Sequence, residues 1–414
     1  NKNYNKIMKV LYFHQHFTTP KAGGAIRSYE FAKRLIARGH QVTMVTGGDY
    51  KKFGLTPTHK KNIYRGDIDG IDVIQISIPY SNSDGLIKRA LSFVKFAWKG
   101  VQIAMKEEYD LLFATTTPLT AGIPGIAAKW FRRKPFVFEV RDLWPELPKA
   151  LGMKNPLALL GMSILEKRSY HAADACIGLS PGIREGILKR SQKGKKVAMI
   201  PNGCDLDIFT PGSRADFPLE GFDPTDTIAV FTGAHGIANG IGAILDAAKV
   251  LKDKGRNDIK LVFVGDGKMK PAMVVRAQKE GLDNCRFYDP VNKATLKGIM
   301  SSADIGLMVL ANVPAFYYGT SPNKFFDYIS SGLPVLNNYP GWLADMISEH
   351  DCGVVVKPED PVAFADGLIM LADNKDKREA WGKHSRTLAE SQFGRDLLGK
   401  QFVDFLEEVY NNAK

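Results

Sequence analysis

The sequence lacks long apolar runs and contains few cysteines. No stretch of about 18 apolar residues occurs, so no membrane-spanning helix is expected, and the polar residues 1–6 are not typical of a signal peptide. The four cysteines, Cys176, Cys204, Cys285 and Cys352, are too widely spaced for a CxxC or Cys/His metal motif. We therefore expect reduced thiols in a cytoplasmic protein and no metal site.

Motifs of several other protein classes are also missing. Zinc-finger spacing, an RNP-type aromatic strand and a convincing helix-turn-helix are absent, so nucleic acid is not an expected partner. The glycine-rich turns lack the dinucleotide fingerprint, which argues against an oxidoreductase. Two Asp-x-Asp patterns occur, at 67–69 before a strand and at 205–207 in a turn-rich segment. Neither position indicates a metal site.

Positive charge is concentrated in the first half of the chain. Residues 1–200 contain 33 Lys and Arg against 15 Asp and Glu, whereas residues 201–414 contain 23 against 29. A basic half indicates an anionic partner, and the missing nucleic-acid motifs favour a membrane surface.

Two segments strengthen the membrane hypothesis. A helix expected over 86–107 interleaves Phe93 and Trp98 with lysines and arginines, and residues 129–134 read Lys-Trp-Phe-Arg-Arg-Lys. Basic, aromatic helices of this kind lie in membrane interfaces. A core-packed helix with a solvated basic face remains the alternative.

Short buried strands alternate with helices along the chain. This order predicts an α/β protein with two Rossmann-like domains, each built on a doubly wound parallel sheet. The expected strands are 8–14, 41–46, 71–78, 136–140, 175–180 and 197–200, then 228–231, 259–264, 285–288 and 303–309. The turn-rich segment near 201–211 separates the two series, and we place the domains at 1–204 and 205–394.

Candidate ligand contacts in the first domain follow its strands. Gly23 and Gly24 lie in the loop after the first strand, where they allow backbone amides to approach a ligand or simply permit a tight turn. Arg141 and Asp142 follow the strand 136–140, at the edge where α/β folds bind ligands. A structural pair between these two residues is the alternative.

In the second domain the segment 319–335 has the signature of a helix N-terminus. Ser321 is a favoured N-cap and Pro322 suits the first helical position. Unpaired N–H groups there suit a phosphate, Lys324 adds a charge, and Asp327 is placed to accept hydrogen bonds from ribose hydroxyls. An ordinary capped surface helix is the alternative. The glycine turns 233–240 and 265–267 should converge on the same sheet edge, which favours a nucleotide-diphosphate site.

Several motifs together resemble the family 4 glycosyltransferases over essentially the whole chain. They are Ile200–Asp205, Val264–Gly267, Phe287–Val291, Ala303 with Asp304, and Asp327 followed by Ser331–Val335. The resemblance implies the GT-B fold, with two Rossmann-like domains facing across a cleft and the nucleotide sugar held mainly by the C-terminal one. It also implies that the last helix, within 395–414, returns to the first domain.

The resemblance assigns roles by position. Asp327 matches the second glutamate of the family's paired motif, which holds the ribose, whereas the first glutamate is replaced by Gly319. The usual diphosphate-binding Arg and Lys, near Ala234 and Asn239, are absent, and Lys324 with the amides of 321–324 is the expected substitute. The nucleotide-sugar contacts implied are Gly233, Gly236, Asn239, Gly265, Asp266, Val291, Ser321, Pro322, Asn323, Lys324 and Asp327.

The activity implied is that of a retaining, metal-independent glycosyltransferase without a cofactor. The Ser-Pro-x-Lys pattern at 321–324 resembles a bacterial subgroup of N-acetylfucosamine type, so the expected donor is a UDP-linked N-acetylated amino sugar. The expected acceptor is a lipid-linked saccharide of O-antigen or capsule synthesis, at the inner face of the cytoplasmic membrane. Lys324, Asp142 and His235 are the catalytic candidates, and Gly23, Gly24 and Arg141 the acceptor-side candidates. A UDP-sugar 2-epimerase and a non-enzymatic anion-binding protein remain alternatives.

Overall fold

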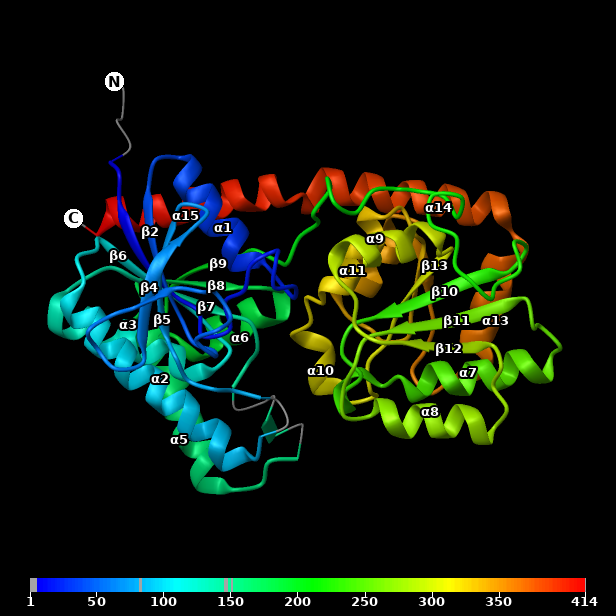
Figure 1. The fold of residues 1–414 in the computed structure, drawn as a ribbon, viewed down its shortest axis with the longest axis horizontal. Coiled ribbons are helices and arrows are strands. Elements are labelled where there is room, and N and C mark those ends of the chain that lie inside the picture. Colours follow the sequence, from blue (N-terminus) through cyan, green and yellow to red (C-terminus); the bar gives the residue numbers. More distant parts are fainter. Residues whose placement is uncertain (1–5, 82–83, 145–147, 150–151, 414) are drawn as a thin grey trace. The chain divides into compact units, whose positions relative to one another are not determined.

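The computed structural model describes residues 6–81, 84–144, 148–149 and 152–413. The chain divides into two compact units, coloured from blue to red along the sequence in Figure 1. The N-terminal unit comprises residues Asn1–Pro201 and Asp396–Lys414, and the C-terminal unit comprises Asn202–Arg395.

The sheet of the N-terminal unit has the strand order β3-β4-β5-β2-β1-β6-β7-β8-β9 in the described residues. Its apolar strands run parallel from β5 to β9, whereas β3 and β4 form an antiparallel edge beside β5. The bounds are β1 Lys9–Phe13, β2 Gln41–Thr46, β3 Thr56–Pro57, β4 Ile63–Ile68, β5 Ile71–Ile76, β6 Leu111–Thr115, β7 Phe136–Val140, β8 Ala175–Gly178 and β9 Lys196–Met199.

Helices cover both faces of this sheet, as a doubly wound fold requires. One core packs the sheet against Phe31 of α1 and Phe402 of α15, and the other packs it against Phe96 of α2, Tyr170 of α5 and Ile183 of α6. The helices are α1 Arg27–Ala37, α2 Leu86–Lys106, α3 Gly122–Arg132, α5 Pro156–Ala172, α6 Pro181–Arg190 and α15 Arg395–Asn412. The last helix, distant in sequence, therefore completes the core of the N-terminal unit.

The C-terminal unit repeats the pattern with a parallel sheet of order β12-β11-β10-β13-β14-β15. Its strands are β10 Thr227–Thr232, β11 Ile259–Val264, β12 Cys285–Tyr288, β13 Ile305–Met308, β14 Val335–Asn337 and β15 Gly353–Val355. Its helices are α7 Gly242–Asp253, α8 Lys270–Lys279, α9 Lys293–Ser302, α10 Pro314–Tyr318, α11 Asn323–Ser330, α12 Trp342–Glu349, α13 Pro361–Asp373 and α14 Lys375–Leu388. Buried side chains pack on both faces of this sheet as well.

The predicted strands are all present, and β2, β7, β11 and β12 have the predicted bounds. The antiparallel hairpin of β3 and β4, the central strand β6 and the edge strand β15 were not predicted. No helix in the described part of the chain is both long and apolar enough to span a bilayer. The four cysteine thiols are buried and unpaired.

Candidate active site

The N-terminus of α11 has no side-chain cap, and the predicted capping by Ser321 is wrong. The Ser321 hydroxyl instead accepts a hydrogen bond from the backbone N–H of Asn202 at 3.0 Å, while the Asn202 side chain donates to the Ser321 carbonyl at 2.7 Å. Pro322 consequently occupies the N-cap position, and the helix begins at Asn323. The first-turn amides of α11 thus have no side-chain acceptor, which suits an anion.

Lys324 is held in the first turn of α11 against the end of β10. Its Nζ lies 4.9 Å from the ring centroid of Phe231, a cation–π distance. No carboxylate among the described residues forms an ion pair with it. Burial lowers the pKa of Lys324 to about 8, and the neighbouring Asp327 opposes this shift. The ammonium group is therefore available to an incoming anion.

Asp327 lies one turn further along α11. Burial raises the pKa of its carboxyl group to about 7, and nearby Asp205 contributes in the same direction. Asp205 is itself neutralised by Arg395 at 3.1 Å and Lys293 at 3.5 Å. Within the described residues no side chain donates a hydrogen bond to Asp327, so its oxygens can accept bonds from a ligand's hydroxyl groups.

The loops after β10 and β11 converge on this helix end, as predicted. The N–H of His235 donates to the carbonyl of Asp266 at 2.9 Å, and the N–H of Gly233 donates to Val264 at 3.0 Å. A Cβ atom on Gly265 would lie 2.0 Å from the carbonyl oxygen of Gly233. Contact between the loops therefore requires glycine at position 265, independently of any ligand.

His235 is fully buried between these loops. Its Nδ1 lies 2.9 Å from the Gly233 carbonyl, which can only accept, so Nδ1 carries the proton. Burial lowers the pKa of His235, and its ring packs edge-on against Phe231. These contacts hold the loop in place. A catalytic role for His235 stays a prediction.

Two further donor-side candidates have different surroundings. The side-chain oxygen of Asn239 accepts a hydrogen bond from the N–H of Gly236 at 3.0 Å and thereby fixes this turn. Val291 is exposed beyond β12. Lys270 was not among the predicted site residues. It lies at the same sheet edge and donates hydrogen bonds to the carbonyls of Gly265 at 2.7 Å and Tyr288 at 3.0 Å.

In the N-terminal unit, Arg141 and Asp142 do not form an ion pair with each other. The Nε of Arg141 donates to the hydroxyl of Thr115 at 2.9 Å, and its nearest carboxylate is Glu139 at 3.8 Å. Asp142 accepts a hydrogen bond from Thr117 at 3.3 Å. Burial raises the pKa of Asp142. Both side chains lie at the carboxyl end of β7, as predicted.

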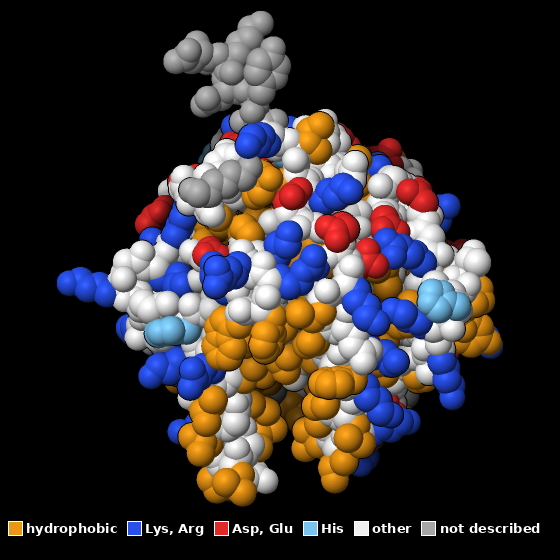
Figure 2. Space-filling view, turned by 90° about the vertical axis from the view of Figure 1, so that its left-hand side faces the viewer, with side chains coloured by type: hydrophobic (Ala, Val, Ile, Leu, Met, Phe, Trp, Pro, Cys, Tyr) orange, Lys and Arg blue, Asp and Glu red, His pale blue; other side chains and the backbone are white. Residues whose placement is uncertain are grey.

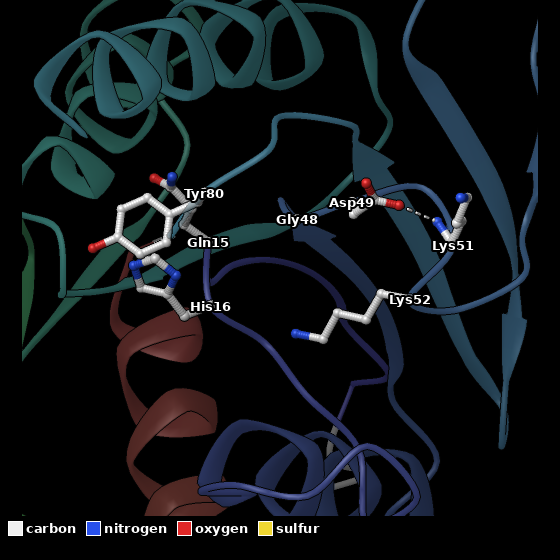
Figure 3. A pocket seen from close by; sticks show the side chains of 7 residues that line it. All are labelled: Gln15, His16, Gly48, Asp49, Lys51, Lys52 and Tyr80. Carbon is white, nitrogen blue, oxygen red and sulfur yellow. Dashed lines mark hydrogen bonds between the residues drawn. The ribbon is translucent and has the colours of Figure 1, made fainter. Parts of the chain in front are cut away.

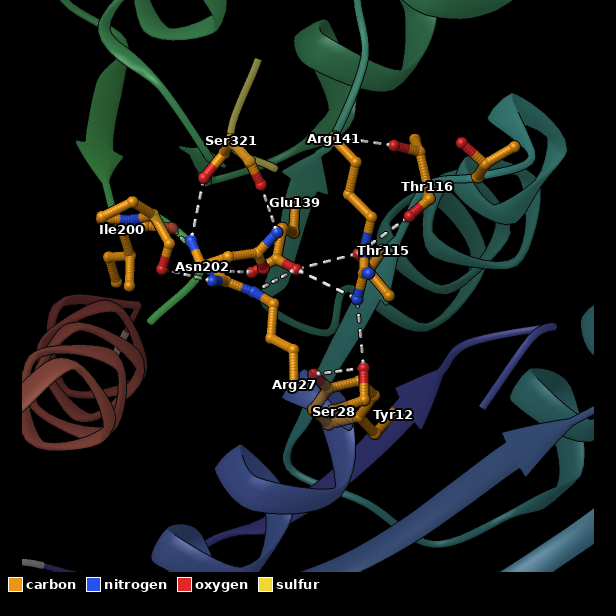
Figure 4. Close-up of polar contacts among 12 residues, drawn as sticks. Tyr12, Arg27, Ser28, Thr115, Thr116, Glu139, Arg141, Ile200, Asn202 and Ser321 are labelled. Atoms are coloured by element: carbon orange, nitrogen blue, oxygen red, sulfur yellow. Dashed lines mark hydrogen bonds and ion pairs between the residues drawn. The ribbon is translucent and has the colours of Figure 1, made fainter. Parts of the chain in front are cut away.

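A buried ion pair beside these residues was not predicted. Arg27 donates to both carboxylate oxygens of Glu139, at 3.2 and 3.0 Å, and to the carbonyls of Ile200 and Pro201 at 2.7 and 2.6 Å (Figure 4). Neither charged side chain is more than 1% exposed. One feature of the sequence indicates this ion pair. Glu139 is an acidic residue inside the apolar strand 136–140, and a buried carboxylate requires a partner.

The glycines of the first loop adopt the backbone conformation that favours glycine. Gly23 and Gly24 have φ angles of +76° and +86°. The Gly23 carbonyl accepts a hydrogen bond from Thr18. A tight turn explains both residues, and a role in acceptor binding stays a prediction. No three potential metal ligands cluster anywhere in the described ranges.

Two parts of the chain match glycosyltransferase family models. Residues 22–208 match Glycosyltransferase Family 4, and residues 213–388 match Glycosyl transferases group 1. D-inositol 3-phosphate glycosyltransferase of Corynebacterium diphtheriae is 24% identical over 266 residues, covering 60% of this chain and 58% of the relative. O-antigen chain mannosyltransferase C of Escherichia coli is 22% identical over 242 residues, covering 58% of this chain and 62% of the relative. The chain thus spans about three fifths of the length of these curated relatives.

A solved structure gives the same fold over the whole length. Anabaena HepE in complex with UDP and glucose superposes with a TM-score of 0.71 at 17% identity, covering 97% of this chain and all of that one. This confirms the predicted fold class. The chain therefore has the GT-B fold, with a region that matches Glycosyltransferase Family 4 followed by a region that matches Glycosyl transferases group 1.

Proposed function

We propose that this protein transfers an N-acetylated amino sugar from UDP to a lipid-linked saccharide during bacterial surface-polysaccharide synthesis. The reaction retains the anomeric configuration and uses neither metal nor cofactor. The observation that carries the donor assignment is the uncapped start of α11 beside a lysine with no carboxylate partner among the described residues. The HepE complex with UDP and glucose and the O-antigen transferase of E. coli support the donor and acceptor classes respectively.

The diphosphate of the donor binds at the start of α11. Asn323 and Lys324 begin α11, where no side chain caps the first turn, and the Lys324 ammonium group lies over the ring of Phe231. Negative charge develops on the leaving diphosphate as the glycosidic bond breaks. Fixed donors at this point stabilise the transition state more than the ground state.

The remaining donor contacts follow from the positions of Asp327 and Gly319. The Asp327 carboxylate accepts hydrogen bonds from the ribose hydroxyls. Gly319 supplies no carboxylate where the family's first glutamate would contact the sugar, so an acetamido sugar is recognised by other groups. Asp142, at the carboxyl end of β7, is the catalytic candidate on the acceptor side.

An anionic bilayer is the proposed docking partner of the N-terminal unit. The docking face consists of the outer sides of α2, α3 and α5, where Trp98, Phe131 and Leu157 are 66%, 73% and 78% exposed. Figure 2 shows hydrophobic side chains gathered on this side of the unit, with lysines and arginines beside them. An apolar face bordered by positive charge complements a bilayer with anionic headgroups.

Replacing Trp98, Trp130 and Phe131 together with serine should weaken binding to phosphatidylglycerol-containing vesicles at least about tenfold. Each fully buried side chain of this size contributes about 1.5–3 kcal/mol. A flotation assay measures the bound fraction. Val275→Ser/Val362→Ser is the matched control, because those residues are also exposed but lie on the C-terminal unit. Equal flotation of the triple variant and the wild type would contradict the docking face.

Donor affinity should depend on pH through two groups. Lys324 must be protonated to bind the diphosphate, so affinity falls above its pKa of about 8. Asp327 is the better acceptor when ionised, so affinity also falls below its pKa of about 7. Calorimetric titration of a UDP-sugar should therefore give the tightest binding between pH 7 and 8. Lys324→Arg should abolish the alkaline decrease, and a wild-type profile that stays flat above pH 8 would contradict the assignment of Lys324.

The proposed reaction is tested by measuring UDP release from a panel of UDP-sugars, with and without lipid-linked saccharides extracted from bacteria. Release that requires one N-acetylated amino-sugar donor together with the lipid extract supports the proposal. Conversion of a donor to its C2 epimer without UDP release contradicts it. Release with a soluble acceptor alone contradicts the lipid-linked acceptor and leaves the donor assignment standing.

A further inference from the structure

The loop that follows β7 is held by an ion pair whose two members come from α5 and α6. The N–H of Trp144 donates to the Glu166 carboxylate of α5 at 2.7 Å. The carbonyl of Trp144 accepts a hydrogen bond from the Arg190 guanidinium at the end of α6, also at 2.7 Å. Arg190 donates to the Glu166 carboxylate as well, which closes a ring of hydrogen bonds. We call the side chains of Glu166 and Arg190 the Trp144 clamp.

The contacts of the Trp144 clamp are strong because both of its members are charged. The Glu166 side chain is 1% exposed, and that of Arg190 is 35% exposed. A hydrogen bond in which one partner is ionised is roughly twice as strong as one between neutral groups. A single residue of the loop therefore has both of its backbone polar groups fixed by charged side chains.

The conformation that the clamp holds carries a cost of its own. The indole N–H of Trp144 is buried and has no hydrogen-bond acceptor among the described residues. A buried donor without an acceptor disfavours the conformation that buries it. Water would satisfy this N–H if the loop moved into solvent. The loop therefore depends on the clamp for its position.

The clamped residue lies two positions after Asp142. Between them, Leu143 packs so closely on α6 that a Cβ atom on Gly186 would lie 2.6 Å from its Cδ1 atom. On the other side of Asp142, the backbone N–H of Arg141 donates to the Thr116 hydroxyl at 2.9 Å (Figure 4). The loop is thus fixed at both ends, with Asp142 between the two attachments.

We propose that Glu166 and Arg190 are positioning residues of the transfer reaction, which hold Asp142 in place by clamping the backbone of Trp144. The inference rests on the proposed function, in which Asp142 is the catalytic candidate on the acceptor side. Asp142 itself accepts its hydrogen bond from Thr117, so the clamp acts through the backbone of the loop. Catalysis is sensitive to such support, because a displacement of about 1 Å can lower a rate about 100-fold.

Glu166→Gln keeps the shape of the clamp but removes its negative charge. At saturating donor and acceptor, the rate of UDP release should fall at least about tenfold. The affinity for UDP should stay within about twofold of the wild type, because the proposed donor contacts lie on the other unit. Arg190→Met is the second variant. It changes a partly exposed side chain and should lower the rate in the same way.

The matched control is Asp174→Asn, because the opposite end of β7 has the same kind of contact. The Asp174 carboxylate accepts hydrogen bonds from the N–H of Phe136 at 2.8 Å and from Lys129 at 2.6 Å. This variant loses an ion pair at the end of the strand that is remote from Asp142. Its rate of UDP release should therefore stay within about twofold of the wild type.

A pH–rate profile at saturating donor separates positioning from stability. Burial raises the pKa of Asp142, whereas Thr117 and Arg141 lower it. In Glu166→Gln the released loop gives Asp142 more contact with water, so its pKa falls and the acid limb of the profile moves to lower pH. The acid limb of Asp174→Asn should coincide with that of the wild type.

Hydrogen exchange tests the clamp without turnover. In Glu166→Gln the amides of Trp144 and Arg141, which lie on either side of Asp142, should exchange at least about tenfold faster. Asp174→Asn should leave both amides protected. This arm decides the clamp even if the wild type releases no UDP, an outcome that would count against the proposed function alone.

Wild-type exchange at both amides in Glu166→Gln would overturn the clamp. Wild-type rates of UDP release in both clamp variants would overturn the positioning role and leave the proposed function intact. Equal losses of rate in the clamp variants and in Asp174→Asn, or an acid limb that does not move in Glu166→Gln, would assign these residues to stability and would also overturn the proposal.

Discussion

Replacing Lys324 with alanine should lower the rate of sugar transfer about 100- to 1,000-fold, which is the usual effect of removing one fixed donor from a transition-state site. The reason is its position: the ammonium group lies in the first turn of α11, over Phe231, without a carboxylate partner in the described residues. The charge that develops on the diphosphate would otherwise be stabilised only by backbone amides. The measurement is UDP release at saturating acceptor.

The matched control is Lys249→Ala, an exposed lysine of α7. Its rate should stay within about twofold of the wild type, because surface substitutions away from a site have small effects. Lys324→Arg keeps the charge and should retain more activity than Lys324→Ala. Wild-type UDP release by Lys324→Ala would exclude Lys324 from the diphosphate site.

Replacing Arg27 with methionine should destabilise the N-terminal unit by about 3–5 kcal/mol, because it leaves the buried Glu139 carboxylate without its cation. The carbonyl groups of Ile200 and Pro201 would lose a donor as well. Hydrogen exchange followed by mass spectrometry gives a local reading. Protection should fall in β1, β6 and β7 and stay unchanged in β10 and β11, which belong to the other unit.

The double variant Arg27→Met/Glu139→Gln tests the physical cause. It removes the unpaired charge, so a large part of the lost protection should return even though the arginine is still missing. Glu139→Gln keeps a side-chain oxygen at position 139, which can still accept the hydrogen bond that the Thr115 hydroxyl donates. Equal protection in the single and double variants would show that packing of Arg27, rather than its pairing with Glu139, stabilises the unit.

Most of the short apolar strands bounded by turns were predictable, although the buried strand β6 was missed. β7 and β11 have the predicted bounds because short runs rich in β-branched and aromatic residues, such as Phe136–Val140, are typical of buried strands. The β3–β4 edge was missed because β3 has only two residues, one of them Pro57, and β4 is only half-buried. Such edges have weak sequence patterns.

The residues of the candidate site could be predicted from the sequence, but only some of their contacts could. Lys324 and the loop at Gly233 were expected to meet, and they do. Ser321 has the right chemistry for capping, but its hydroxyl accepts a hydrogen bond from the backbone N–H of Asn202, 119 positions earlier. The capping prediction failed because this partner is distant in sequence. The pocket lined by Gln15, His16 and Lys52 (Figure 3) is formed by the loops after β1, β2 and β5, and contacts between separate loops are set by tertiary structure rather than by local sequence pattern.

The packing of α15 on the first sheet has a consequence for folding during synthesis. Leu398, Phe402, Val403 and Leu406 are all buried in the core that includes β1 and β2. Residues 1–201 emerge from the ribosome first but lack this part of their core until the last helix has been made. The C-terminal unit, encoded later, can complete its own core earlier. A premature stop near residue 396 would therefore damage the beginning of the protein more than its end.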